Sequence, residues 1–271
     1  MGVGQSKAFG LQIANVGALA VTIIANLLSN ILRTDGKNVG EISDAYPNLF
    51  TPAGYVFSIW GIIYTLLLLF TVYQSSPKRR GELFLRKIGY YFVLSCVANV
   101  IWLYLWLSEQ IVVSLVPMFV LLGSLIVIYL RLQIGWSEAP RNERLLVHLP
   151  FSVYLGWITV APIANVAAAL TAIGWDGWGI NETYWAVLVI AVAVIITTAV
   201  IVTRKDAAFS LVIIWALIGI LAKQIGNQLV STTAGLGAIA VALVLASIFL
   251  ATKGRKVKKQ AGSALDSPWK P

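Results

Sequence analysis

Long apolar stretches, separated by short charged or Gly/Pro-rich breaks, make up most of the chain. They run for about 16 to 24 residues without a charge, the length that a helix needs to cross a hydrocarbon core of about 30 Å. The pattern therefore predicts eight membrane-spanning helices, of which the seventh is the shortest because Lys223 follows it. The predicted spans are 10–32, 53–74, 86–107, 111–130, 146–172, 184–203, 207–222 and 230–252.

The composition supports an all-α, polytopic transmembrane bundle whose main partner is the lipid bilayer. Of the 271 residues, 59% are hydrophobic and 11% are charged, whereas an ordinary soluble domain has about 25% charged residues. A water-soluble fold of this size would lack the polar surface to cover itself. Composition and run length thus lead to the same fold class.

The positions of the basic residues predict the orientation of the bundle. Cytoplasmic loops collect Lys and Arg, and a cytoplasmic N-terminus places 17 of the 20 basic residues on that side, against Arg33, Lys37 and Lys223 on the other. Eight spans then leave both termini in the cytoplasm, as expected for a plasma or inner membrane protein. The net charge of +9 comes from loops and a basic tail at 253–271, so no nucleic-acid partner is expected.

The chain offers few groups for covalent or metal chemistry. It contains one cysteine, Cys96, and one histidine, His148, which excludes an intrachain disulfide, a thiolate metal cluster and a bis-histidine haem site. Neither a Ser-His-Asp set nor a Gly-rich phosphate loop is recognisable. We therefore expect no catalytic residue, no metal site and no required cofactor, and we do not expect an enzyme.

A stripe of polar residues runs along the first predicted helix. Polar groups within a membrane need partners, so they usually face the bundle interior. The three-to-four and seven-residue spacing of the stripe places its members near one helix face. Two roles remain open, namely amides that hold helices together and groups that line a ligand pocket. The members are Gln12, Asn15, Thr22, Asn26 and Asn30.

Aromatic residues also lie inside the predicted spans, where leucine would serve equally well against lipid. Trp60 and Tyr64 are four residues apart and share a helix face, as do Trp102 and Trp106. Rings that face the interior can form a flat-walled cavity for a planar apolar ligand, which indole N–H and amide groups would orient. The other members of this set are Asn99, Tyr104, Tyr154 and Trp157.

Three segments resemble the TspO/MBR family of tryptophan-rich sensory proteins, which includes the mitochondrial translocator protein. Segment 51–64 is similar to the family's first loop and second helix. Its sequence is Thr-Pro-Ala-Gly-Tyr-Val-Phe-Ser-Ile-Trp-Gly-Ile-Ile-Tyr. Asn-Val-Ile-Trp at 99–102 is similar to the Asn-x-x-Trp of the third helix. Tyr-Leu-Gly-Trp at 154–157, followed by Asn165, is similar to the fifth-helix pattern. The chain departs from the family at Tyr55, where Trp is usual, and at Val153, where Pro is usual.

The resemblance covers roughly residues 10–172 and implies a five-helix bundle at 1–175 that binds porphyrins, haem-type ligands, sterols or similar hydrophobic planar molecules. Residues 176–252 would then be three further spans, before the basic tail at 253–271. Relatives are often dimers, so the resemblance also implies a homodimer. The candidate ligand-binding residues are Trp60, Tyr64, Asn99, Trp102, Tyr154, Trp157 and Asn26.

A ligand-binding receptor or sensor is the leading functional hypothesis, and a small-molecule transporter or exporter is the alternative. Ion-coupled carriers usually have ionisable residues near mid-membrane, whereas Glu109, Asp206 and Lys223 lie at the ends of predicted spans. A deeply buried and paired Lys223 would favour transport.

The loop at 174–181 and the residues that follow it are rich in aromatic side chains. Amphipathic rings are favoured at the depth of lipid headgroups. The simplest role for these residues is therefore to anchor the protein in the membrane interface. They are Trp175, Trp178, Tyr184 and Trp185.

Overall fold

The computed structural model describes residues 3–31 and 37–265, and in 3–5, 30–31 and 252–265 it describes the backbone alone. The side chain of Asn30, the last member of the predicted polar stripe, therefore lies outside the described residues. All regular structure in this part of the chain is helical, as predicted. The elements are α1 (Val3–Ile31), α2 (Val39–Ala45), η1 (Gly54–Ser58), α3 (Ile59–Gln74), η2 (Pro77–Arg79), α4 (Leu83–Ile88), α5 (Tyr91–Leu107), α6 (Ile111–Leu132), α7 (Arg141–Glu143), η3 (Arg144–His148), α8 (Leu149–Ala172), η4 (Gly177–Gly179), α9 (Glu182–Arg204), α10 (Ala207–Lys223) and α11 (Gln228–Leu265).

Each of the eight predicted spans corresponds to an apolar helix. Six are long and apolar enough to cross a membrane, and α5 and α10 are shorter apolar helices of 17 residues each. The third span was predicted to begin at residue 86, but α5 begins at Tyr91. The reason is Gly89, whose positive φ of 54° ends α4 and redirects the chain. A polytopic helical membrane bundle is confirmed.

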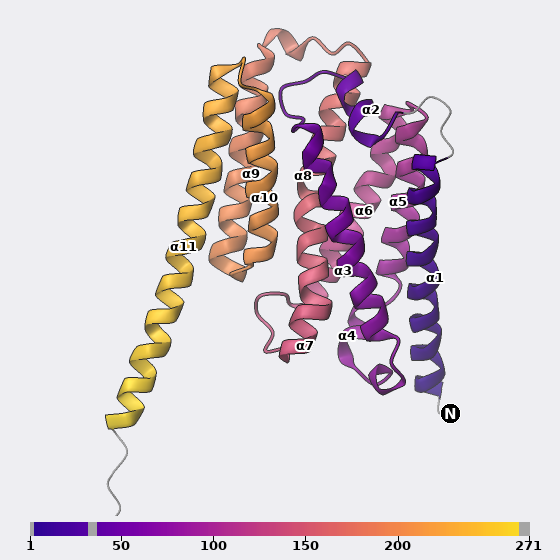
Figure 1. Cartoon of the computed structure of the whole chain (residues 1–271), viewed down its shortest axis with the longest axis vertical. Coiled ribbons are helices and arrows are strands. Elements are labelled where there is room, and N and C mark those ends of the chain that lie inside the picture. The colour runs from indigo at the N-terminus through magenta and orange to yellow at the C-terminus, as the bar shows by residue number, and fades with distance from the viewer. Residues whose placement is uncertain (1–2, 32–36, 266–271) are drawn as a thin grey trace, which may run out of the picture.

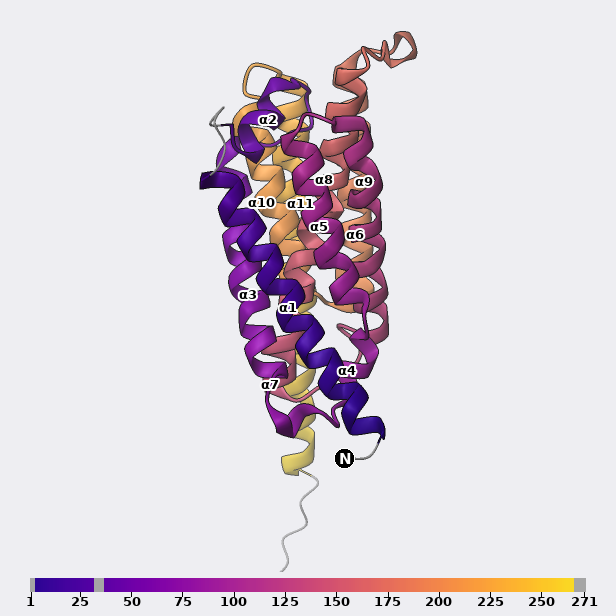
Figure 2. The same cartoon turned by 90° about the vertical axis from the view of Figure 1, so that its right-hand side faces the viewer.

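Helix α8 lies at the centre of the bundle and places the candidate site. It packs against α3 and α6 on one side and against α10 on the other (Figure 1). Helix α1 packs on α3 and α5, while α9, α10 and α11 pack on one another. The start of α1 and the end of α11 lie at one end of the bundle, the terminal end, and α2 lies at the opposite end, the α2 end (Figures 1 and 2).

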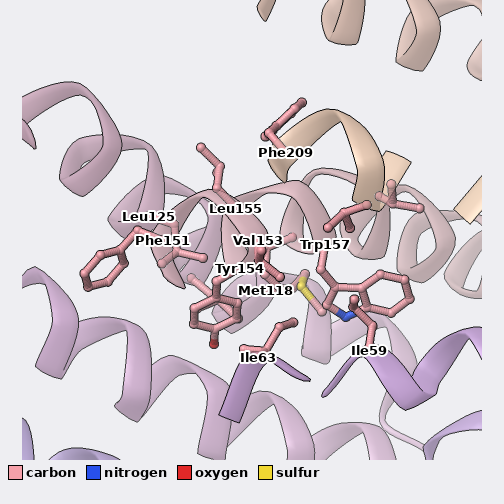
Figure 3. Packing of buried hydrophobic residues seen from close by; sticks show 14 of the residues in the cluster. Ile59, Ile63, Met118, Leu125, Phe151, Val153, Tyr154, Leu155, Trp157 and Phe209 are labelled. Atoms are coloured by element: carbon pink, nitrogen blue, oxygen red, sulfur yellow. The ribbon is translucent and has the colours of Figure 1, made fainter. Parts of the chain in front are cut away.

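The core around α8 is built from interlocking aromatic and aliphatic side chains (Figure 3). The rings of Phe70, Phe92 and Phe151 meet edge to face, with centroids 5.1 to 5.8 Å apart. This arrangement is the one that ring quadrupoles favour. Apolar side chains such as Leu68 and Val116, in contrast, are at least half exposed along the helices, as a surface that faces lipid requires.

Helix α10 reaches α8 through a glycine. A Cβ on Gly156 would lie 3.0 Å from the Phe209 carbonyl oxygen and 3.1 Å from Val212 Cβ. Small residues let membrane helices approach closely, because dispersion contacts rather than hydrophobic burial hold them together in lipid. Gly156 therefore allows α10 to pack directly on the central helix.

The polar stripe of α1 joins this helix to the end of α3. Gln74 Nε2 donates to the Gln12 carbonyl (3.1 Å), and Asn15 Nδ2 donates to Gln74 Oε1 (3.3 Å). Gln12 Nε2 donates in turn to the carbonyl oxygens of Gln74 and Ser76. These amides are buried, so the terminal half of the stripe has the helix-joining role. Asn26, further along α1, reaches the aromatic cluster described next.

Candidate ligand-binding site

Trp60 is the centre of a buried aromatic cluster formed by α3, α5 and α8. Its ring stacks on Tyr64 (centroids 5.5 Å apart) and on Trp102 (5.9 Å). The rings of Tyr154 (6.0 Å) and Trp157 (6.3 Å) meet it edge to face. Helical spacing explains the arrangement, since Trp60 and Tyr64 lie one turn apart on one face of α3. Trp60 thus makes two stacked contacts, in which the rings are inclined by 20° and 28°.

Asn99 links the four helices around the cluster through its amide. Its Oδ1 accepts hydrogen bonds from Asn26 Nδ2 and Tyr64 Oη, and its Nδ2 donates to Tyr154 Oη, each at 3.3 Å. The side chain is 1% exposed, where an unpaired amide would be costly. These three bonds join α1, α3 and α8 to α5, and they fix both tyrosine hydroxyls.

A second amide, Asn165, holds the far side of the cluster. Its Oδ1 accepts from Trp102 Nε1 at 3.0 Å and from Ser114 Oγ at 3.2 Å. Its Nδ2 lies 3.4 Å from the Ile111 carbonyl oxygen, to which it donates. Asn165 therefore ties α5, α6 and α8 together and sets the plane of the Trp102 ring.

Trp157 carries a buried polar group that the cluster leaves unpaired. The residue, labelled in Figure 3, is 2% exposed, and its indole N–H has no acceptor among the described residues. Buried donors are paired in the great majority of cases. Trp157 borders a cavity of about 20 Å³ whose walls include Phe57, Trp60, Trp102 and Trp106. Because ligand sites usually measure about 300–1,000 Å³, the site is closed in this structure.

The segment 52–58, here called the lid, covers the cavity at the α2 end. Pro52 and Phe57 line the cavity, and the Phe57 ring meets Trp157 edge to face at 5.7 Å. The lid consists of a short extended stretch and η1, and it leads directly into α3. Displacement of this segment would open the cavity without separation of the long helices.

Helix α10 holds the lid from the other side. The Ala53 N–H donates to the Gly219 carbonyl (3.1 Å), and Trp215 Nε1 donates to the Val56 carbonyl (3.2 Å). The Tyr55 ring also meets Trp215 edge to face at 5.3 Å. A Cβ on Gly219 would overlap with Val56 Cγ2, so glycine is needed for this close approach. The lid is thus fastened to a helix that the sequence analysis had left outside the pocket.

The structure brings together all seven residues that were predicted as the ligand site. Sequence reasoning did not place Phe57 and Trp106 at the cavity, nor α10 against the lid. The first two were discoverable, because Phe57 lies in the motif-bearing segment and Trp106 follows Trp102 by one helical turn. Tyr104, which was grouped with the aromatic residues inside the spans, is 69% exposed and lies away from the cluster, since a two-residue step moves to the opposite side of a helix.

The charged residues at span ends are paired there. Lys223 Nζ binds Asp44 Oδ1 at 2.5 Å at the α2 end, and its side chain is 26% exposed, so it does not lie deep in the bundle. Asp206 is buried, accepts hydrogen bonds from Tyr129 Oη (2.9 Å) and Ser152 Oγ (2.6 Å), and caps α10. Among the described residues, no group of three or more His, Cys, Asp or Glu could hold a metal ion.

By its fold, the chain is a multi-pass integral membrane protein with a buried aromatic cluster. A family model described as TSPO-like protein matches residues 12–248, and the chain belongs to this family. A search of curated proteins and a search of solved structures each gave no match. The family match extends from α1 into α11 and includes α10. The division of the chain at residue 175 stays a prediction.

Proposed function

We propose that the chain is a membrane receptor or sensor that binds a hydrophobic planar ligand, such as a porphyrin or a sterol, in the aromatic cluster. The observation that carries the proposal is the unpaired N–H of Trp157 beside the cavity under the lid. A hydroxyl, carbonyl or carboxylate oxygen of the ligand would accept this hydrogen bond. Such a bond would orient the ligand within otherwise apolar walls.

Affinity would come mainly from ring faces and buried area. The stacked faces of Trp60 and Trp102 are suited to a flat ligand, and burial of its apolar surface contributes about 25 cal/mol per Å² before the costs of ordering are subtracted. Asn99 would keep Tyr64 and Tyr154 in place as the rings separate. This mode of binding requires neither a catalytic residue nor a cofactor.

The proposal includes an orientation with both termini in the cytoplasm of a cell with a plasma or inner membrane. Its support is the distribution of basic residues together with the position of both helical ends at the terminal end of the bundle (Figure 1). The lid would then face the opposite side. Homodimer formation stays a prediction. The transporter hypothesis gains no support from Lys223, which is paired but 26% exposed near the α2 end and does not lie deep in the bundle.

A double substitution, Trp60→Ala with Trp157→Ala, tests the proposed site. It removes one stacking face and the unpaired donor, so protoporphyrin IX should bind at least about tenfold more weakly, or about 1.4 kcal/mol. The measurement is a titration of purified protein in detergent, followed by porphyrin fluorescence and corrected for inner-filter effects.

Trp136→Ala is the matched control, because Trp136 is 60% exposed and contacts Arg204 away from the cluster. Its affinity should equal that of the unmodified protein. Equal and non-saturating signals from all three proteins would show that the rings serve only in packing.

A further inference from the structure

A second, larger cavity lies between α8 and α9 at the α2 end of the bundle. Its volume is about 820 Å³, within the range of small-molecule sites. The 173–181 connection, which lies at the α2 end of the bundle (Figure 2), contributes part of its lining. Its long wall is apolar and comes from the outer face of α8, the start of α9 and the 47–50 segment. These wall residues are Pro47, Leu49, Phe50, Ile163, Val166, Ala167, Leu170, Ala186 and Val189.

Three tryptophans line one side of this cavity, which is called the groove from here on. Trp175, Trp178 and Trp185 contact one another in pairs, with centroids 5.4 to 5.8 Å apart and rings inclined by 54 to 82°. Trp185 Nε1 donates to the Gly177 carbonyl at 3.1 Å, which fixes its ring under the turn. Inclined ring faces of this kind attract organic cations through their quadrupoles. A role in membrane anchoring alone does not explain why the three rings converge over a cavity.

The charged groups that line the groove are both acidic. Asp176 and Glu182 border the cavity, and its lining within the described part of the chain includes no Lys, Arg or His side chain. Both carboxylates are held in place by backbone groups. Asp176 Oδ1 accepts from the Trp178 N–H (2.9 Å), and Glu182 Oε1 accepts from the Leu49 N–H (3.1 Å). The groove thus combines an apolar wall, a ring cluster and two fixed negative charges.

We propose that this groove binds an amphipathic organic cation, a molecule with an ammonium group at the carboxylates and tryptophans and an apolar body along α8. Charge complementarity selects this class over a phospholipid. The phosphate of a phospholipid would lie beside the carboxylates of Asp176 and Glu182 without a basic partner. Neighbouring negative charges repel one another. The site is separate from the aromatic cluster around Trp60 and does not depend on porphyrin binding.

The experiment measures binding of radiolabelled dodecyltrimethylammonium to the full-length protein in phosphatidylcholine nanodiscs, with empty nanodiscs subtracted. Asp176→Asn together with Glu182→Gln removes both charges but keeps acceptors for the two backbone N–H groups, so the fold should persist. Ala167→Phe fills the groove without a change in charge. Glu41→Gln is the control, because it removes one charge at the same end and the glutamine can still serve in the α2 capping box.

We expect saturable binding to the unmodified protein and to Glu41→Gln, with affinity at least about tenfold lower in the neutralised double variant and in Ala167→Phe. Dodecyl maltoside, which has the same tail and no charge, should not compete at equal concentration. Circular dichroism and elution volume report whether each variant is folded. Equal binding by the neutralised variant, or equal competition by dodecyl maltoside, would overturn the proposal and leave an apolar groove without charge selection. Binding to the unmodified protein no greater than that to empty phosphatidylcholine nanodiscs would equally contradict it.

Discussion

A disulfide between the lid and α10 is expected to abolish porphyrin binding in the oxidised protein and to restore it on reduction. The structure favours Val56→Cys with Gly219→Cys, because a Cβ at position 219 would lie 3.4 Å from Val56 Cβ, close to the roughly 3.5–4.5 Å of natural disulfides. The same Cβ would lie 3.0 Å from Pro52 Cβ, so Pro52 has to shift by a small amount. Val56→Cys also removes the methyl group that would overlap with the new side chain. Cys96, which is buried in α5, is replaced by Ala to avoid side reactions.

The loss of binding follows from the size of the closed cavity. At about 20 Å³, it holds no planar ligand unless Phe57 and the rest of the lid move away. Titration of the same sample with protoporphyrin IX, before and after treatment with dithiothreitol, separates a locked lid from a damaged fold. Val56→Cys alone should bind equally in both states. If the oxidised double variant binds as tightly as its reduced form, the ligand does not enter beneath the lid.

Asn165→Leu is expected to lower the stability of the protein while leaving every aromatic ring of the site in place. It removes the acceptor for the buried Trp102 N–H, whereas the Ser114 hydroxyl keeps the Ile111 carbonyl as an acceptor at 2.6 Å. A buried donor without a partner costs about 1–3 kcal/mol, although single hydrogen bonds between membrane helices often contribute less, about 0.6 kcal/mol on average. We therefore expect a decrease of about 2 kcal/mol in the free energy of unfolding.

Unfolding of the purified protein by sodium dodecyl sulfate, followed by circular dichroism, measures this decrease. Thr159→Val serves as the control, because the Thr159 hydroxyl donates only to the Leu155 carbonyl one turn earlier in α8 and joins no other helix. Its effect should be small. Equal stability of Asn165→Leu and the unmodified protein would mean that Asn165 does not hold α5, α6 and α8 together.

The sequence was sufficient to predict the helices and the members of the aromatic cluster. Run length alone located the spans, because the bilayer sets a fixed length for each crossing. Helical spacing then placed Trp60 beside Tyr64 and Trp102 beside Trp106, and the structure shows each pair stacked. The polar residue Asn26 was likewise expected to face inward, and it binds Asn99.

The sequence did not predict the contact between the lid and α10. Trp215 and Val56 are separated by 159 positions. The hydrophobic pattern of a helix that is apolar on every face does not indicate which other helix it packs against. Gly219 and Gly156 mark close approaches, but glycines are common in membrane helices for several reasons. The groove between α8 and α9 was missed for the same reason. From the sequence, its tryptophans are equally consistent with interfacial anchors. The structure adds that the three rings contact one another beside a cavity.

Circular dichroism in the Soret region of protoporphyrin IX tests most directly whether a planar ligand binds between Trp60, Trp102 and Trp157. The free porphyrin is achiral, so a signal arises only when an asymmetric ring environment holds it in one orientation. We expect an induced band that saturates at a fixed stoichiometry. Trp157→Phe keeps an aromatic ring but lacks the N–H, so this substitution should weaken or alter the band. If porphyrin associates with the unmodified protein but no induced band appears, the result contradicts a defined site in the aromatic cluster.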